Sequence, residues 1–191
     1  MLITRTLARS LPRPVTHRSG FSVLEVAFAM IILAVAIGGL VAASASSYQL
    51  SRSNQARSAA HEAARQVVEQ LRSADATQVY ALYNEDPADD PAGAGTAPGP
   101  GFSVDSLNVL GDDDDGLVGR IFFPVDEGSV LRESVAYSPL DMPRDLNLDG
   151  VIDGNDRSGD YVLLPVGVEL DWRGGKTTGH YEVHILLMAI R

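Results

Sequence analysis

Residues 19–43 read SGFSVLEVAFAMIILAVAIGGLVAA, and this stretch decides how the rest of the chain is organised. Residues 26–43 contain no charged side chain and no hydroxyl group, and a helix of this length spans most or all of a bilayer. Glu25 lies at the edge of the apolar run, where a carboxylate is costly in hydrocarbon and is a functional candidate by default. The stretch therefore predicts a membrane helix with one acid near its start.

The basic charge of the chain is concentrated before this helix. Residues 1–20 contain four arginines and no acid, whereas the whole chain carries −10, so residues 21–191 carry −14. A basic leader before an apolar segment predicts that the N-terminus stays in the cytoplasm and that the acidic remainder is exported. The acidic remainder argues against nucleic acid as a partner, because phosphate binding needs a basic surface. Since the chain has no cysteine, an exported domain relies on its core or on a metal instead of a disulfide.

The position of Gly20 distinguishes this segment from a secretory signal peptide. A signal peptide has its small-residue cleavage site after the apolar region, whereas Gly20 comes before it. Cleavage between Gly20 and Phe21 leaves the helix on the mature chain, with a new amino group on Phe21. The other interpretation is an uncleaved signal anchor in which Glu25 has no special role. We favour cleavage because ordinary anchors seldom place an acid inside the span.

Gly20, Glu25 and the apolar run, in this register, resemble the class III signal of type IV pilins and type II secretion pseudopilins. The resemblance covers about residues 18–71. It implies that a prepilin peptidase cuts after Gly20 and methylates Phe21, and that Glu25 takes part in docking between subunits. A neighbouring subunit's N-terminal amine is a cation that can pair with such a carboxylate. Major pilins often carry a proline within the apolar helix, whereas this chain has two adjacent glycines there, which is closer to minor pilins and minor pseudopilins.

The helical pattern continues beyond the apolar run. Alanine and aliphatic residues recur at three- and four-residue steps, which places them on one helical face. They are Ala56, Ala60, Ala63, Val67 and Leu71. We expect one helix over residues 21–74, with a transmembrane or filament-core half at 21–43 and an amphipathic half within 44–85. Residues 86–101 hold four prolines and four glycines and are expected to be a linker.

Short runs with strand character, separated by turn residues, follow this linker in the region 102–191. They are 102–109, 117–125, 130–137, 161–172 and 180–190. The clearest alternation places Val166, Val168, Leu170 and Trp172 on one face of a strand. The sequence therefore predicts an α+β, pilin-like fold, in which a long N-terminal helix packs on a C-terminal antiparallel sheet of four or five strands.

Residues 145–156, which read DLNLDGVIDGND, have the spacing of a 12-residue calcium loop. The expected ligands are five side chains and one backbone carbonyl: Asp145, Asn147, Asp149, Asp153, Asp156 and the carbonyl of Val151. Gly150 is expected to make the sharp turn, and Ile152 is expected to pack inward. Because the twelfth position has an aspartate instead of the usual glutamate, the loop resembles a dockerin-type loop more than an EF-hand. Calcium is the predicted cofactor, and the other interpretation is a solvated acidic turn.

Two further polar clusters carry weaker signals. Residues 112–116 (DDDDG) fail the calcium-ligand spacing and are expected to form a solvated acidic turn. His180, Glu182 and His184 share one face of a strand, but a separation of about 7 Å between such neighbours is wide for one ion, so an ordinary exposed strand face is expected. No nucleophile elbow, phosphate loop or zinc-protease motif is present, and an enzyme is not expected.

The leading hypothesis is a minor pilin or pseudopilin, a structural subunit that crosses the inner membrane once and holds its C-terminal region outside the cytoplasm. It would be processed by prepilin peptidase and assembled with other pilin or pseudopilin subunits into a type IV pilus or a type II secretion pseudopilus. The second hypothesis is a membrane-anchored, calcium-dependent module that recruits a protein ligand through the loop at 145–156. A third, an enzyme on an anchor, has no supporting residue.

Overall fold

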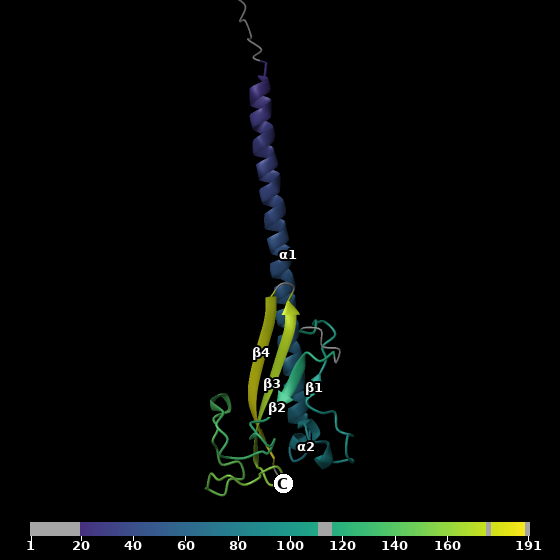
Figure 1. Cartoon of the computed structure of the whole chain (residues 1–191), viewed down its shortest axis with the longest axis vertical. Helices are drawn as coiled ribbons and strands as arrows, with labels where there is room; N and C mark the ends of the chain where they lie inside the picture. Colours follow the sequence, from purple (N-terminus) through teal and green to yellow (C-terminus); the bar gives the residue numbers. More distant parts are fainter. Residues whose placement is uncertain (1–19, 111–115, 175–176, 190–191) are drawn as a thin grey trace, which may run out of the picture. The chain divides into compact units, whose positions relative to one another are not determined.

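The computed structural model describes residues 20–110, 116–174 and 177–189. The chain divides into two compact units, 1–46 and 47–191, and we call the second of these the head unit. The leader before Gly20 and the predicted acidic turn, except Gly116, lie outside the described residues. In the described residues a long helix packs on a four-stranded antiparallel sheet, which confirms the predicted α+β, pilin-like layout (Figure 1).

Helix α1 (Val23–Ser73) contains 51 residues, and each end lies within two residues of its predicted bound. Its sequence is rich in alanine and has no proline, so the backbone hydrogen bonds continue without interruption. In the head unit the helix buries one face, made by Ala60, Ala64, Val68 and Leu71. The other residues of the predicted face pack partly buried against the core; they are Ala56, Ala63 and Val67. The helical period read from the sequence is therefore confirmed.

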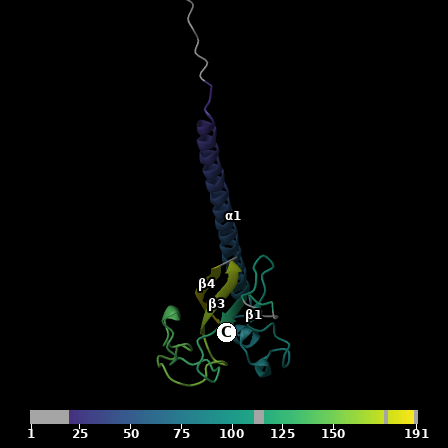
Figure 2. The same cartoon turned by 45° about the horizontal axis from the view of Figure 1, so that its top comes forward.

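The sheet of the head unit has the strand order β1-β2-β3-β4, and all neighbouring strands are antiparallel (Figures 1 and 2). The strands are β1 (Gly101–Phe102), β2 (Gly119–Phe122), β3 (Leu163–Gly174) and β4 (Thr177–Met188). β3 and β4 form a long hairpin, paired from Leu163 opposite Met188 to Gly174 opposite Thr177. β2 pairs with the other side of β3, so β4 is an edge strand of the described sheet.

One face of this sheet packs on helix α1. The predicted alternation in β3 is confirmed, because its four even-numbered apolar residues from 166 to 172 are at most 3% exposed. His61 of α1 lies against Tyr181 of β4, with 4.0 Å between the ring centroids, so the helix covers the same face. Gly179 allows the close approach of Trp172, since a Cβ atom at 179 would lie 2.2 Å from the indole ring.

Two of the predicted strands need correction. The run 102–109 has strand structure only at its first residue, and the run 130–137 forms no strand. In the second run each pairing residue meets a different segment: Leu131 bridges Val125, Arg132 bridges Asp156, and Tyr137 bridges Met142. A ladder needs successive residues to face one partner strand, so strand propensity alone could not produce one here.

Residues 123–162, which we call the β2–β3 connection, contain the short helix η2 (Ser138–Leu140) and otherwise follow an irregular path. The connection is packed, because Leu131 and Leu146 are fully buried. Before the sheet, the chain forms α2 (Val79–Tyr83) and η1 (Pro87–Asp89), and the rest of the predicted linker up to β1 is irregular. The hydroxyl of Tyr161 donates a 2.7 Å hydrogen bond to the carbonyl of Ala76 and so joins the end of the connection to the segment after α1.

Candidate functional site

The predicted cleavage site lies just before helix α1. Gly20 and Phe21 are not helical, and the helix begins at Val23. Both residues are exposed, Phe21 to 80%. Proteases cut accessible, non-helical backbone most readily. The local structure is therefore compatible with cleavage between Gly20 and Phe21.

Glu25 lies in the first turn of α1, where an acid is favourable beside the helix N-terminus. Its backbone N–H donates to the side-chain oxygen of Ser22 at 3.2 Å. Ser-x-x-Glu is the capping-box pattern, a signal present in the sequence that the interpretation above did not use. Among the described residues no ion pair involves the Glu25 carboxylate. Ser22 thus caps the start of the helix through the backbone N–H of Glu25, whose carboxylate has no described counter-charge.

The apolar part of α1 is unburied. Its most apolar 18-residue window has a mean hydropathy of 2.7, and none of that window is buried. After Glu25 the next charged residue of the helix is Arg52. By length and composition this segment qualifies as a membrane span or as a signal sequence.

The six predicted calcium-ligand residues lie on one irregular loop, 145–156, within the β2–β3 connection. Gly150 has a φ of 89°, so the sharp turn predicted at the sixth position of the loop is confirmed. Leu148 has a φ of 62°, a left-handed conformation that is uncommon for a residue with a side chain. The backbone therefore adopts a positive φ at two positions of the loop, 148 and 150.

The prediction that Ile152 packs inward is wrong. Its side chain is 53% exposed, and Leu148 and Val151 are exposed to similar degrees, 56% and 58%. The loop is anchored instead by Leu146, which precedes the turns and is fully buried. Three aliphatic side chains therefore face solvent on an otherwise acidic loop.

Many carboxylate oxygens of the loop accept hydrogen bonds from its own backbone. Asp145 uses both oxygens, accepting from the N–H of Leu148 at 2.7 Å and from the N–H of Gly150 at 2.8 Å. Three other aspartates accept from the N–H two residues later: Asp149 from Val151, Asp153 from Asn155, and Asp156 from Ser158. Hydrogen bonds from Asn147 and from the Val151 backbone lower the pKa of Asp149. Such Asx turns shape a loop without a metal.

One oxygen each of Asp149 and Asp153 faces Arg157, whose side chain is 8% exposed. Its guanidinium lies within ion-pair distance of four carboxylates: Glu133 at 3.3 Å, Asp149 at 3.5 Å, Asp153 at 3.1 Å and Asp160 at 3.1 Å. Burial opposes the charge, but Glu133, Asp153 and Asp160 outweigh it and raise the pKa of Arg157 above its ordinary value. The loop is therefore folded around a cation that belongs to the chain.

Glu133 is the buried counterpart of this arginine and is fully inaccessible to solvent. Its Oε1 accepts from the N–H of Leu146 at 2.9 Å, and its Oε2 accepts from the N–H of Asp153 at 3.0 Å. One carboxylate thus joins both arms of the loop, and these bonds offset the cost of burying it. Sequence reasoning missed Glu133 because it placed residues 130–137 in a strand, where an acid is an ordinary solvent-facing residue.

The structure brings a cation of the chain, Arg157, to two of the predicted calcium ligands. In the ranges that the structure describes, no group of three or more acidic or histidine side chains is placed to hold a metal. Asp149 and Asp153 both face the guanidinium of Arg157, which would repel a divalent ion placed between them. The calcium site therefore stays a prediction, and it requires Arg157 to move away from these carboxylates.

A second polar cluster lies on the face of the β3–β4 hairpin that helix α1 does not cover. The Tyr137 hydroxyl donates to Glu182 at 2.7 Å, and Nε2 of His184 lies 2.7 Å from the same carboxylate oxygen. The bond from Tyr137 lowers the pKa of Glu182, while burial raises the pKa of Tyr137 to about 12. Nearby, Asp171 bonds His180 at 2.9 Å and raises the pKa of this histidine. The cluster ties the β2–β3 connection to β4.

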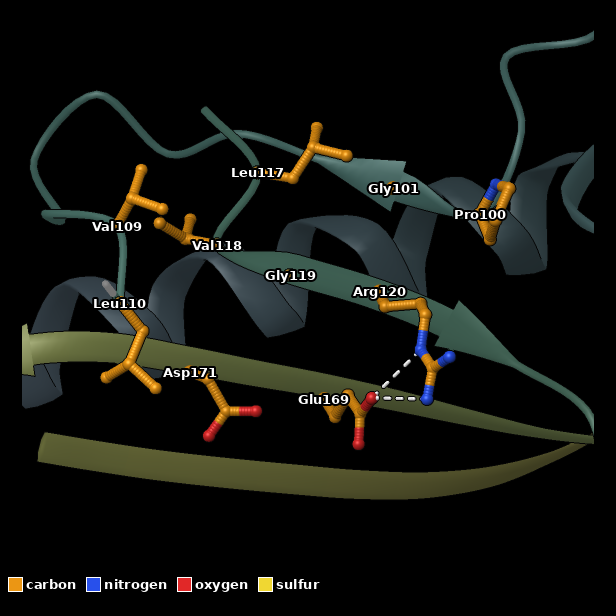
Figure 3. Close-up of a pocket in the computed structure, with 10 residues that line it drawn as sticks. All are labelled: Pro100, Gly101, Val109, Leu110, Leu117, Val118, Gly119, Arg120, Glu169 and Asp171. Carbon is orange, nitrogen blue, oxygen red and sulfur yellow. Dashed lines mark hydrogen bonds and ion pairs between the residues drawn. The ribbon is translucent and has the colours of Figure 1, made fainter. Parts of the chain in front are cut away.

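A groove of about 350 Å³ lies beside β1, β2 and β3, and Figure 3 draws the residues that line it. Val109, Leu110 and Leu117 contribute its apolar lining. At its charged end, Nε and Nη2 of Arg120 lie 2.9 and 2.8 Å from one oxygen of Glu169. Because these opposite charges satisfy each other, they supply no unpaired charge for a ligand, and we assign the groove no function.

Comparison of the chain with protein-family models, with curated proteins and with solved structures finds no match.

Proposed function

We propose that the chain is a minor pilin or a type II secretion pseudopilin, a structural subunit anchored in the inner membrane by helix α1. The observation that carries this proposal is the helix itself. One helix contains an unburied apolar segment with a single acid in its first turn and, further on, an amphipathic segment packed in the head unit. A simple anchor needs only the apolar segment, so the acid and the extended amphipathic segment both favour assembly.

Glu25 supports assembly because a carboxylate in a membrane segment needs a partner. The described residues offer it no counter-charge. Cleavage after Gly20 would create a free amine on Phe21, and the amine of a neighbouring subunit would supply the missing charge. In this proposal prepilin peptidase cleaves and methylates the chain, and the subunits then pack through their helices into a pilus or pseudopilus.

The charge distribution supports the orientation. The four arginines before Phe21 favour a cytoplasmic leader, and the −14 carried by the remainder favours export of the head unit. The subunit would therefore await assembly as a single-pass inner-membrane protein with its head unit outside the cytoplasm.

The test is the mass of the N-terminus of the protein from membranes of cells that express prepilin peptidase. We expect a mature chain that starts with N-methylated Phe21, and we expect the full-length chain when the peptidase is absent. A chain that keeps Met1 in both strains would contradict the proposal.

The role of Glu25 in docking can be separated from its role in the capping box. Glutamine serves as well as glutamate in a capping box, whereas alanine does not. We therefore expect Glu25→Gln to insert normally but to be lost from sheared filaments, because it keeps the cap and removes the charge. Ser22→Ala, which removes the cap and keeps the charge, is the matched control and should still assemble. Incorporation of Glu25→Gln at the level of the unchanged chain would exclude a docking role for the charge.

One observation favours a second candidate, a membrane-anchored binding module. Leu148, Val151 and Ile152 expose aliphatic surface on a loop that is held rigidly by buried charges. Such a loop is suited to contact a protein ligand. The N-terminal mass distinguishes the two candidates, because a module of this kind needs no cleavage at Gly20.

A further inference from the structure

We propose that Arg157 is the resident cation of the 145–156 loop, that it takes the place a divalent metal would occupy, and that its removal converts the loop into a calcium-responsive site. This inference concerns the head unit and does not depend on filament assembly. Its starting point is the disagreement described above, between a sequence with calcium-loop spacing and a structure in which an arginine meets the carboxylates.

The charge balance around Arg157 is the first support. One guanidinium contacts four carboxylates, so the cluster keeps a strong excess of negative charge. Arg157 is also nine-tenths buried, and in the described part of the chain its Nε atom has no hydrogen-bond partner, although Glu133 lies 3.3 Å away as an ion pair. An incompletely satisfied buried donor among excess acids indicates that the arginine is held there by charge and by backbone position, not by an ideal hydrogen-bond fit.

Backbone hydrogen bonds position both members of the ion pair between Arg157 and Glu133. The N–H of Arg157 donates to the carbonyl of Leu131 at 2.9 Å, and the carbonyl of Glu133 accepts from the N–H of Arg144 at 3.1 Å. Leu131 and Glu133 are two residues apart, so Arg157 and Glu133 are positioned by the same short segment. The backbone of Arg157 is therefore held beside the residue that carries its buried counter-charge.

The geometry also places two of the predicted ligand oxygens around one position. Both Oδ2 atoms, of Asp149 and of Asp153, lie beside the same guanidinium nitrogen, Nη2 of Arg157, at 3.5 and 3.1 Å. Calcium binds oxygen at about 2.3 to 2.6 Å, so these atoms would need to close by only about 1 Å on an ion at the position of Nη2. The arginine and the ion are thus alternatives for one position.

The experiment uses the full chain in detergent micelles and follows its thermal unfolding. Trp172 is the only tryptophan and is buried in the head unit, so its fluorescence reports unfolding of this unit. We expect the unchanged chain to have the same melting temperature in chelator and in millimolar calcium. Arg157→Met should lower the melting temperature in chelator by about 5 °C or more, and calcium should restore a large part of this loss.

Three variants serve as controls. Arg144→Met makes the same substitution in the same connection, but among the residues with described positions the Arg144 side chain pairs only with the exposed Asp141, so this variant should create no calcium response. Arg157→Lys keeps a positive charge and should also stay unresponsive. Arg157→Met combined with Asp153→Asn removes one expected ligand and should lose the response that Arg157→Met gains.

Two results would overturn the inference. One is a calcium-dependent rise in the melting temperature of the unchanged chain, because the loop would then bind metal with its arginine in place. The other is an Arg157→Met chain that folds but shows no calcium response by melting or by calorimetric titration. If Arg157→Met does not fold under either condition, Arg157→Gln, which keeps hydrogen-bond donors without charge, takes its place and the same two results decide.

Discussion

The β3–β4 hairpin and the 145–156 loop lie in the same unit, but they bury opposite kinds of side chain. The hairpin turns its aliphatic residues to the core, and Val166, Val168 and Leu170 have no exposed surface. The loop buries Leu146 but exposes its three other aliphatic residues, and it depends on two charged residues packed against it, Glu133 and Arg157, that are almost completely buried. The conformation of the hairpin is stabilised mainly by packing of apolar surface, and that of the loop mainly by pairing of charges.

The difference explains how each region responds to change. Apolar packing is non-directional, and the stability lost when a buried apolar side chain is shortened grows with the surface removed. A buried ion pair is cooperative with its hydrogen bonds, and removing one partner leaves the other charged and desolvated. Substitution of one buried charged residue should therefore destabilise the loop strongly. Substitutions in the hairpin should each lower its stability by an amount that follows the apolar surface removed.

The largest effect is expected from Glu133→Gln. It replaces a charged acceptor with a neutral amide beside Arg157 and the N–H groups of Leu146 and Asp153. We expect the free energy of unfolding of the head unit to fall by about 4 kcal/mol, measured by urea denaturation with Trp172 fluorescence.

Hydrogen exchange of the same variant tests whether the effect begins in the loop. The amides of Leu146 and Asp153 should lose more protection than those of the central hairpin pairs. Equal loss of protection in both regions would show that the two regions unfold together, and it would contradict the expectation that the effect begins in the loop.

An effect of about 3 kcal/mol is expected from Leu170→Ala, which removes fully buried apolar volume from the hairpin. Leu148→Ala is its matched control, because the same atoms are removed from a side chain that is 56% exposed. The control should change the free energy of unfolding by less than about 0.5 kcal/mol. A large effect at Leu148 would mean that the loop packs its aliphatic residues in solution.

The smallest effect concerns the pH dependence of the hairpin. The hydrogen bond that His180 donates to the Asp171 carboxylate raises the folded-state pKa of His180, so its contribution to stability is complete below the unfolded pKa of about 6.5 and is lost as the pH rises through the folded value. Both side chains are about half exposed, so we expect only a few tenths of a kcal/mol. The measurement is urea denaturation of both chains at about pH 6 and about pH 8. Asp171→Asn should abolish this part of the pH dependence of stability. An unchanged pH dependence in the variant would contradict the assignment to His180 and Asp171.

The elements with a long hydrophobic period were predictable from the sequence. Helix α1 and the hairpin repeat their patterns over many residues, and each repeat adds to the signal. The run 130–137 has strand propensity, but its residues bridge three separate segments, and no local pattern encodes such partners. Tertiary pairing therefore overrode propensity in the β2–β3 connection.

The candidate site was predictable in position but not in chemistry. The spacing in 145–156 correctly located a tightly turned acidic loop with Gly150 at the turn. It could not reveal that Arg157, one residue beyond the pattern, folds back onto Asp149 and Asp153, or that Glu133, distant in sequence, supports both arms. The spacing of a ligand motif predicts which side-chain oxygens are available, but it does not predict which cation lies beside them in the folded chain.

Strand β4 has a consequence for how the protein behaves at high concentration. It is the last strand of the described sheet, and in this hairpin the N–H and C=O groups of its even-numbered residues point away from β3. Among the described residues these outward groups have no hydrogen-bond partner. Such an edge is a template for aggregation, which proteins often prevent with proline, lysine or a bulge. β4 has no proline or lysine, and its acidic and histidine side chains are Glu182, His180 and His184. Colloidal stability should therefore fall as salt rises, since salt screens the repulsion between like-charged molecules that would otherwise pair through this edge.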